Sequence, residues 1–304
     1  MNKYNSICSI QFYNDVGFKV IKDWLIKNSH CSINHDFFNT LSPKTNIEIL
    51  KDLQNHTNEL LTSLTDNNPI PLNDIPNISK WLPNLQIKGN RLNSDNFQEL
   101  YQILILSTDI KKYIKKNNFP LWYNYRSKLI NSNTLITKIE KIFNESFEIK
   151  VNATTKLKNL TQSISKIEND IKNTIQKYLH RAKQEDWLAG DQIVLRNGRS
   201  ALPIKVNKKR KIKGIIQGQS SSGQTVFIEP FDIIELNNKI TELQYKIIEE
   251  KQLILKNLTA FFIPLSDKIN KTFNILVLLD QHYTMAKFAH QIKAIKPKIN
   301  TNGE

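Results

Sequence analysis

The sequence predicts a mainly α-helical protein: a helical core domain, two long antiparallel helices, and a small antiparallel β-rich insert at their tip. Neither glycine nor proline occurs in residues 121–189 or 231–263, so both stretches can form long helices. Five of the eight glycines lie between residues 190 and 223. Because glycine marks turns and weakens helices, this segment predicts a different kind of structure.

Residues 1–120 predict the helical core domain. Helical periodicity runs through residues 12–27, 45–64 and 94–114, and prolines interrupt the chain between these segments. Asn93 or Ser94 is suited to be the N-cap of the third helix. At the other end of the chain, residues 264–304 predict an amphipathic helix over 265–292 that returns to the core, followed by a tail.

The two long helices fall in residues 121–190, after a connection, and in residues 231–263. Apolar residues in each recur mostly at steps of three or four, as in a heptad seam. The first stripe is Leu157, Leu160, Ile164, Ile167, Ile171 and Tyr178; the second is Leu236, Ile240, Leu243, Ile247, Ile254, Leu258 and Phe261. Two such helices on either side of a short insert predict an antiparallel pair that holds the insert at its tip. The alternative is that each stripe packs separately into a globular core.

Residues 191–230 predict the β-rich insert. A strand over 192–196 runs into Asn197-Gly198, a strong hairpin signal, and apolar alternation continues through Ala201, Ile204 and Val206. The basic run 208–211 predicts a turn, and further strands are expected at 212–217 and 225–228. Pro230 then closes the sheet, and the second long helix begins at Phe231.

The charge of the chain is strongly positive, at a formal +15, which favours polyanionic partners. Only six of the 43 basic residues are arginine, so a compositional drift toward lysine is an alternative explanation. The insert argues against drift, because it contains three of those arginines and has eight basic residues against two acidic ones. Phosphate contacts from such a surface give affinity without sequence readout. The alternative is a merely solvated face.

The candidate nucleic-acid-binding residues all lie in the insert. They are Arg196, Arg199, Lys205, Lys208, Lys209, Arg210, Lys211 and Lys213, with a Ser/Gly loop whose free backbone N–H groups suit phosphate. That loop comprises Ser220, Ser221, Ser222 and Gly223.

No catalytic site is expected in this chain. The segment Gly218–Thr225 matches the phosphate-binding loop GxxxxGK[ST] except at its lysine, which is Gln224 here, and a strand rather than a helix is expected to follow. His30, Cys31 and His35 lack the ligand spacing of a structural zinc site. No cofactor and no metal are therefore expected in this chain.

The remaining composition predicts a cytoplasmic protein without a membrane segment. Two cysteines, Cys8 and Cys31, are too few for a disulfide scaffold and fit a reducing compartment. The first 15 residues lack the apolar stretch of a signal peptide. The longest unbroken aliphatic run is only Ile275–Leu279, far short of a membrane span.

A long run of the sequence resembles a known family. The segments Ile193–Arg199, Leu202–Val206, Lys211–Ile215 and Gln219–Pro230, with Glu235–Asn238 after them, resemble the clamp of the bacterial MutS paralogues that usually end in a Smr nuclease domain. The resemblance is weaker toward the N-terminus. Ser200 departs from the aromatic residue usual in that family, and Gln217 and Gly218 depart from its usual histidine and acidic residue.

The resemblance implies a core domain, lever helices and a clamp, followed in the full-length family by an ATPase domain that uses ATP and Mg²⁺ and by a Smr domain. This chain ends at Glu304, where the ATPase domain is expected to begin. The resemblance also implies that the full-length protein is a homodimer that binds DNA, including branched DNA. It implies a role in DNA repair and suppression of recombination and, in some relatives, the rescue of stalled ribosomes through ribosomal RNA. The alternative function is a helical module that binds a protein partner, with an incidental basic face.

Overall fold

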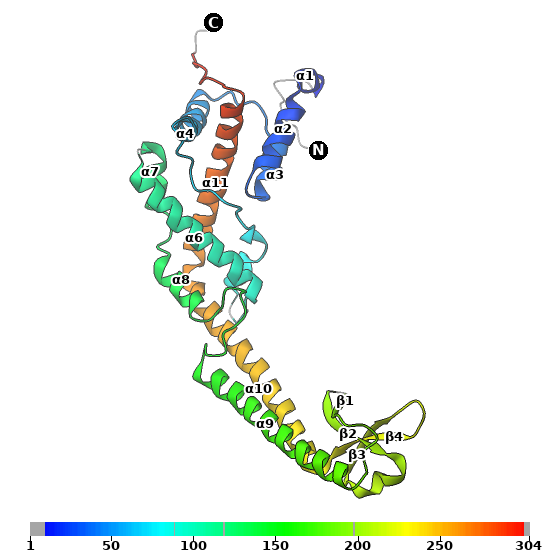
Figure 1. The fold of residues 1–304 in the computed structure, drawn as a ribbon. Coiled ribbons are helices and arrows are strands. Elements are labelled where there is room, and N and C mark those ends of the chain that lie inside the picture. The colour runs from blue at the N-terminus through cyan, green and yellow to red at the C-terminus, as the bar shows by residue number, and fades with distance from the viewer. Residues whose placement is uncertain (1–9, 88, 118, 197, 301–304) are drawn as a thin grey trace. The chain divides into compact units, whose positions relative to one another are not determined.

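The computed structural model describes residues 10–300, except Lys88, Asn118 and Asn197. The chain divides into two compact units. We call residues 1–148 with 255–304 the core unit, and residues 149–254 the lever unit. The described chain is mainly helical with one four-stranded antiparallel sheet, which confirms the predicted fold class (Figure 1). None of its helices has a stretch long and apolar enough to cross a membrane.

The named elements of the core unit, within its described part, are all α-helices or 3₁₀ turns, joined by loops. Its elements are α1 (Ile10–Asp15), α2 (Phe18–Asn28), α3 (Ile33–Asn39), α4 (Ile47–Thr65), the 3₁₀ turn η1 (Ile78–Lys80), α5 (Leu82–Leu85), α6 (Ser94–Lys116), α7 (Pro120–Arg126), α8 (Asn133–Glu140), the 3₁₀ turn η3 (Ile263–Leu265) and α11 (Ser266–Gln291). The helix expected over 12–27 is two helices, because Gly17 between them adopts a left-handed conformation with φ of 66°. Asn93 is the N-cap of α6, as predicted, and exchanges hydrogen bonds with Asn96 in a capping box.

Helix α11 lies at the centre of the core unit, where it packs against α2, α3 and α4 (Figure 1). The prediction that it is amphipathic is wrong, because its buried side chains are distributed around the helix and not along one stripe. The sequence suggested a polar side because several of these buried residues are themselves polar. They include Thr272, Asp280, His282 and Thr284.

Asp280 shows how such a polar residue is accommodated. Its carboxylate is fully buried and accepts hydrogen bonds from the backbone N–H groups of His30 at 2.9 Å and Cys31 at 3.1 Å. It also accepts one from Asn34 Nδ2 at 2.7 Å and one from Thr284 Oγ1 at 3.2 Å. The charge therefore ties α11 to the segment that leads into α3, and every donor it meets would lose its partner without it.

Buried His282 makes the stability of the core unit depend on pH. Burial, together with the neighbouring His56, lowers the pKa of His282 to about 4. Between that value and an unfolded pKa of about 6.5, the unfolded chain binds a proton that the folded chain does not. Stability is therefore complete above this window and falls as the pH falls through it, by about 1.4 kcal/mol per pH unit and ~3 kcal/mol in all. Urea unfolding from pH 7 to pH 4 measures this, and His282→Gln is expected to remove that part of the slope; an unchanged slope would contradict it.

The lever unit contains α9 (Thr155–Gln184) and the greater part of α10 (Phe231–Phe262). They are antiparallel, since Tyr178 near the end of α9 donates to Asp232 at the start of α10, whereas Thr154 at the start of α9 donates to Glu250. Figure 1 shows them side by side, in green and yellow to orange. α9 begins only at residue 155 although the stretch without glycine and proline begins at 121, because α7, α8 and a connection occupy the earlier part.

The two predicted seams differ in detail from the packed ones. On α9 the buried stripe includes Ile175, 1% exposed, which continues Ile167 and Ile171 at steps of four and was not predicted. At the end of α10 the prediction chose Phe261, which is 42% exposed, whereas its neighbour Phe262 is fully buried. A heptad count cannot predict which residues are buried at this end of α10, because the residues after Ile254 pack into the core unit and no longer face α9.

The insert forms the four strands of the sheet in the order β1-β2-β4-β3. They are β1 (Val194–Arg196), β2 (Arg199–Lys205), β3 (Gly214–Gln219) and β4 (Thr225–Pro230), with the 3₁₀ turn η2 (Val206–Lys211) between β2 and β3. Arg196 pairs with Arg199, which leaves a two-residue hairpin; Gly198 in it has φ of 76°, and Asn197 lies outside the described residues. The expected alternation through Ala201, Ile204 and Val206 is wrong, since Ala201–Ile204 are all buried and Val206 leaves the sheet.

One face of the sheet joins the lever helices in a common hydrophobic core. Leu202 and Ile204 of β2 and Val226 and Ile228 of β4 pack with Ile175 and its neighbours on α9. The edge strand β3 approaches β4 so closely at Gly214 that a Cβ there would lie 2.2 Å from the backbone oxygen of Glu229. Glycine is therefore required at this position. The sheet is fixed to the end of the helix pair by burial and not by the connecting loops alone.

Candidate nucleic-acid interface

Five of the eight basic residues of the insert lie together on η2 and just after it. Lys209, Arg210, Lys211 and Lys213 are exposed, and Lys208 is half-buried. Ile212, within this run, is only 5% exposed and packs into the core of the lever unit. The basic turn predicted at 208–211 is thus held in place by the burial of Ile212, and its basic side chains face solvent. We call these five basic residues the tip cluster.

Two other candidate cations already have carboxylate partners. Arg199 lies 3.3 Å from Glu229 and also donates to Asn238 at 2.8 Å. Lys205 Nζ donates to Asp186 Oδ1 at 2.7 Å, and this bond lowers the pKa of Asp186 below its usual range. Because a carboxylate already offsets the charge of each, these two cations are less available to a phosphate than the tip cluster is.

Arg196 belongs to another face of the sheet. Its guanidinium stacks over the ring of Phe227 at 4.3 Å from the centroid, and the Arg196 side chain remains exposed. A guanidinium held flat on an aromatic ring retains its outward N–H groups. Arg196 can therefore hold a phosphate without losing its place on the sheet.

The serine-rich loop offers fewer amides than the sequence suggested. Ser220 N–H donates to Thr225, Gly223 N–H donates to Ser220, and the Thr225 N–H donates to Ser220 Oγ at 3.1 Å. Ser220 Oγ also lies 3.2 Å from Ser222 Oγ, while Ser221 is exposed. The expectation of free backbone N–H groups is therefore wrong for Ser220 and Gly223, because these groups close a tight hairpin turn.

The same hairpin explains why the phosphate-binding-loop pattern does not indicate a nucleotide site. Residues 220–224 join the antiparallel strands β3 and β4, and the next helix begins only at Phe231. A nucleotide-binding loop needs a helix N-terminus directed at the phosphates and a lysine, and here a strand follows Gln224.

Glu229 is the residue that sequence reasoning missed. It is fully buried and accepts hydrogen bonds from Gln217 at 2.6 Å, from Asn237 at 2.6 Å and from Arg199. These donors come from β3, α10 and β2, so one carboxylate connects three elements. Its sequence signal was an acidic residue next to Pro230 in a segment with eight basic residues and only one other acidic residue. Gln217, which departs from the histidine usual in the resembling family, still supplies a donor to it.

The potential metal ligands are used elsewhere or dispersed. His30 lies 3.7 Å from Asp74 and 3.1 Å from Lys287, and burial lowers its pKa. Cys31 is buried, and burial raises the pKa of its thiol; Cys8 lies outside the described residues. Among residues 10–300 as described, no three His, Cys, Asp or Glu side chains are grouped so as to hold a metal ion.

Comparison with known proteins finds relatives that share the name endonuclease MutS2. It is 30% identical over 273 residues to the endonuclease MutS2 of Caldicellulosiruptor saccharolyticus, a match that covers 88% of this chain. It is 28% identical over 303 residues to that of Lachnospira eligens, which covers 100% of the chain. The chain is a homologue of the MutS2 endonucleases. No protein-family model matches it.

The chain spans only about a third of the length of these MutS2 relatives. The chain spans 34% of the Caldicellulosiruptor saccharolyticus MutS2 and 37% of the Lachnospira eligens MutS2. A third relative, MutS2 of Caldicellulosiruptor bescii, is 29% identical over 269 residues and is covered over 34% of its length. Because the match to the Lachnospira protein covers the whole chain, it includes both units and the insert, which confirms the resemblance seen first in residues 191–238.

Proposed function

We propose that residues 191–230 bind the backbone of DNA and that this chain is the DNA-binding region of a MutS-like protein. The observation that carries the proposal is the tip cluster, five cations presented by a turn that is anchored through Ile212. Each such contact releases counterions from the duplex, which favours binding regardless of sequence. The relatives are endonucleases by name, which agrees with a nucleic-acid substrate.

The positions of the acidic residues support the same assignment. Of the two acids within the insert, Glu229 is buried and neutralised by Arg199, while Asp191 lies 3.8 Å from Lys183. Neither lies within residues 208–213, which contain five basic and no acidic residues. Asp186, outside the insert, is paired with Lys205 and is near enough to Lys208 for that charge to lower its pKa as well. A cluster of this kind steers a polyanion and holds it near the sheet.

The helix pair α9 and α10 then serves as a lever for the insert in this proposal. The shared hydrophobic core makes the sheet and the adjoining helix ends one body, so a load on the tip cluster passes into both helices. For the whole protein we propose, from the resemblance of residues 191–238 to the MutS paralogues, a role in DNA repair and suppression of recombination.

Lysine footprinting tests the proposal directly. The full chain is acetylated with and without a 30-base-pair duplex (about three helical turns), and each lysine is quantified by mass spectrometry. Lys208, Lys209, Lys211 and Lys213 are expected to be protected, because contact with phosphates keeps their amines protonated and the bound duplex excludes the acetylating reagent. The exposed Lys158 and Lys166 of α9 and Lys251 of α10 are the matched controls and should react equally in both samples.

Equal protection of the lever lysines would show that only bulk charge attracts DNA and would overturn the assignment. Protection absent everywhere would favour the protein-binding alternative. A duplex RNA of the same length distinguishes the polymers, since the proposal requires DNA to protect the tip cluster at least as well as RNA.

A further inference from the structure

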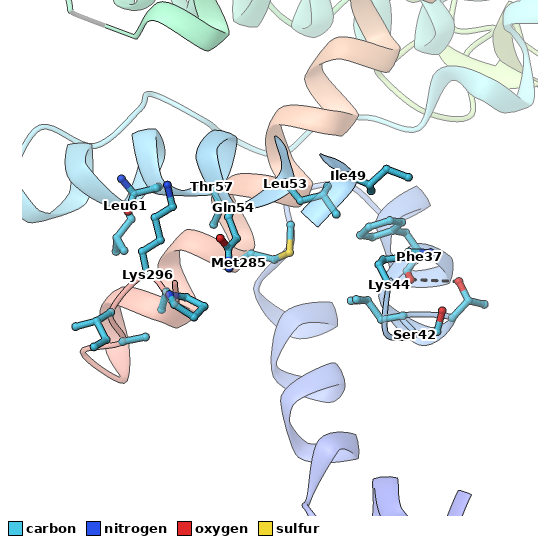
Figure 2. A pocket seen from close by; sticks show the side chains of 17 residues that line it. Phe37, Ser42, Lys44, Ile49, Leu53, Gln54, Thr57, Leu61, Met285 and Lys296 are labelled. Carbon is cyan, nitrogen blue, oxygen red and sulfur yellow. Dashed lines mark hydrogen bonds between the residues drawn. The ribbon is translucent and has the colours of Figure 1, made fainter. Parts of the chain in front are cut away.

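A groove of about 590 Å³ lies on the core unit, and none of its lining residues belongs to the insert (Figure 2). Its walls come from three segments: the end of α3 with the loop after it, one side of α4, and the end of α11 with the residues that follow. The lining includes Phe37 and Lys44 from the first segment, Ile49 and Leu61 from α4, and Met285 and Lys296 from the third segment.

The floor of the groove is formed by a row of residues along α4 that is long enough to contact a helix. Ile49, Leu53, Thr57 and Leu61 recur every four residues along α4, a row that extends over ~18 Å at the rise of an α-helix. Ile49 is 49% exposed and Leu53, Thr57 and Leu61 are half-buried, so the rest of the described chain covers this row only in part. The opposite wall contributes a small side chain, Ala289, beside Met285, which leaves room for apolar side chains between the walls.

The rim of the groove is positively charged. Figure 2 shows Lys296 at the end where Leu61 lies and Lys44 at the end near Phe37. A second hollow shares Lys296 and adds Lys51 and Lys298. Among the described residues that line either hollow, none is acidic. Lys296 Nζ donates to Asn55 Oδ1 at 2.5 Å, which keeps the final segment beside α4.

We propose that this groove binds an acidic amphipathic helix of a partner protein. An apolar floor of three helical turns fits apolar side chains spaced along one face of a helix, and the lysine rim fits carboxylates on its flanks. DNA fits less well than such a helix, because three of the four residues in the row along α4 are apolar and offer no hydrogen bond to a phosphate. A second copy of this chain fits poorly, because a net charge of +15 brings like charges together.

The test uses a fluorescent, helix-forming peptide of about 14 residues, enough to cover the ~18 Å row. It has leucine at every third or fourth position and glutamate on both flanks. Anisotropy with the full chain is expected to show saturable one-to-one binding. Two control peptides, one with lysine in place of glutamate and one with serine in place of leucine, are expected not to bind.

Variants locate the site. Ile49→Glu places a carboxylate on the floor and is expected to weaken binding by about tenfold or more. The double variant Lys44→Glu, Lys296→Glu should do the same by reversing the rim. Ile87→Glu is the matched control, since Ile87 is 56% exposed and does not line the groove. Substituting the tip cluster should also leave peptide binding unchanged.

Several results would overturn the proposal. They are no saturable binding of the acidic peptide, equal binding of the lysine peptide, or full affinity in Ile49→Glu. Loss of binding when the tip cluster is substituted would assign the peptide to the insert. Self-association of the full chain in sedimentation, abolished by Ile49→Glu, would identify a second copy as the occupant and also overturn it.

Discussion

Replacing Glu229 with alanine is expected to destabilise the lever unit by about 3–5 kcal/mol, because the carboxylate is buried and its partners would be left without an acceptor. Gln217 and Asn237 would each lose a bond of 2.6 Å, and Arg199 would lose its ion pair. Hydrogen exchange measured by mass spectrometry should show faster exchange across residues 199–230, and DNA affinity should fall with it.

Two variants control this prediction. Glu235→Ala removes an exposed acid only six residues away and should change stability by no more than ~0.5 kcal/mol. Glu229→Gln retains the shape and one acceptor oxygen and should lie between the two. Protection of 199–230 that is unchanged in Glu229→Ala would show that the hydrophobic core alone fixes the sheet, contrary to the role assigned to this carboxylate.

Asp280→Ala is expected to cost about 3–5 kcal/mol in the core unit, since it leaves several buried donors unsatisfied. The amides of His30 and Cys31 would lose their acceptor, and Asn34 Nδ2 would lose one of its two acceptors, keeping only the Val277 carbonyl oxygen. Urea unfolding at pH 7, followed by tryptophan fluorescence, measures the change. Asp66→Ala, at an exposed carboxylate after α4, is the matched control and should be nearly neutral. A loss in Asp280→Ala no larger than in this control would contradict the account.

The sequence predicted most of the fold because its signals were local. Clustered glycines, Gly198 in its two-residue turn and the Asn93 cap each determine backbone geometry within a few residues. What could not be predicted depends on distant parts of the chain. Asp280 is buried because residues about 250 positions earlier supply donors, and Phe262 rather than Phe261 is buried because α10 changes neighbours after Ile254.

The candidate site was predictable as a charge pattern but not as a set of available groups. Arg199 and Lys205 looked equivalent to Lys209 in the sequence, yet their partners Glu229 and Asp186 become visible only in the folded lever unit. Likewise, a Ser/Gly loop suggests free amides, but the hairpin uses those of Ser220 and Gly223. Basic composition therefore overstated the number of cations ready to meet phosphate.

The salt dependence of DNA binding in two charge-matched variants tests the central claim most directly. The tip variant changes Lys208, Lys209, Arg210 and Lys211 to glutamine. The lever variant changes the exposed Lys158, Lys166, Lys172 and Lys251 to glutamine and leaves Lys156, which pairs with buried Glu250 at 3.0 Å, intact. Both lose four charges, so bulk attraction falls equally.

The measurement is the slope of log affinity against log salt for a duplex, by anisotropy. We expect the tip variant to flatten this slope by up to about four units, since each phosphate contact contributes close to one. The lever variant should keep nearly the slope of the natural chain. Equal flattening in both variants, or none in the tip variant, would contradict the assignment of residues 191–230 as the DNA-binding insert.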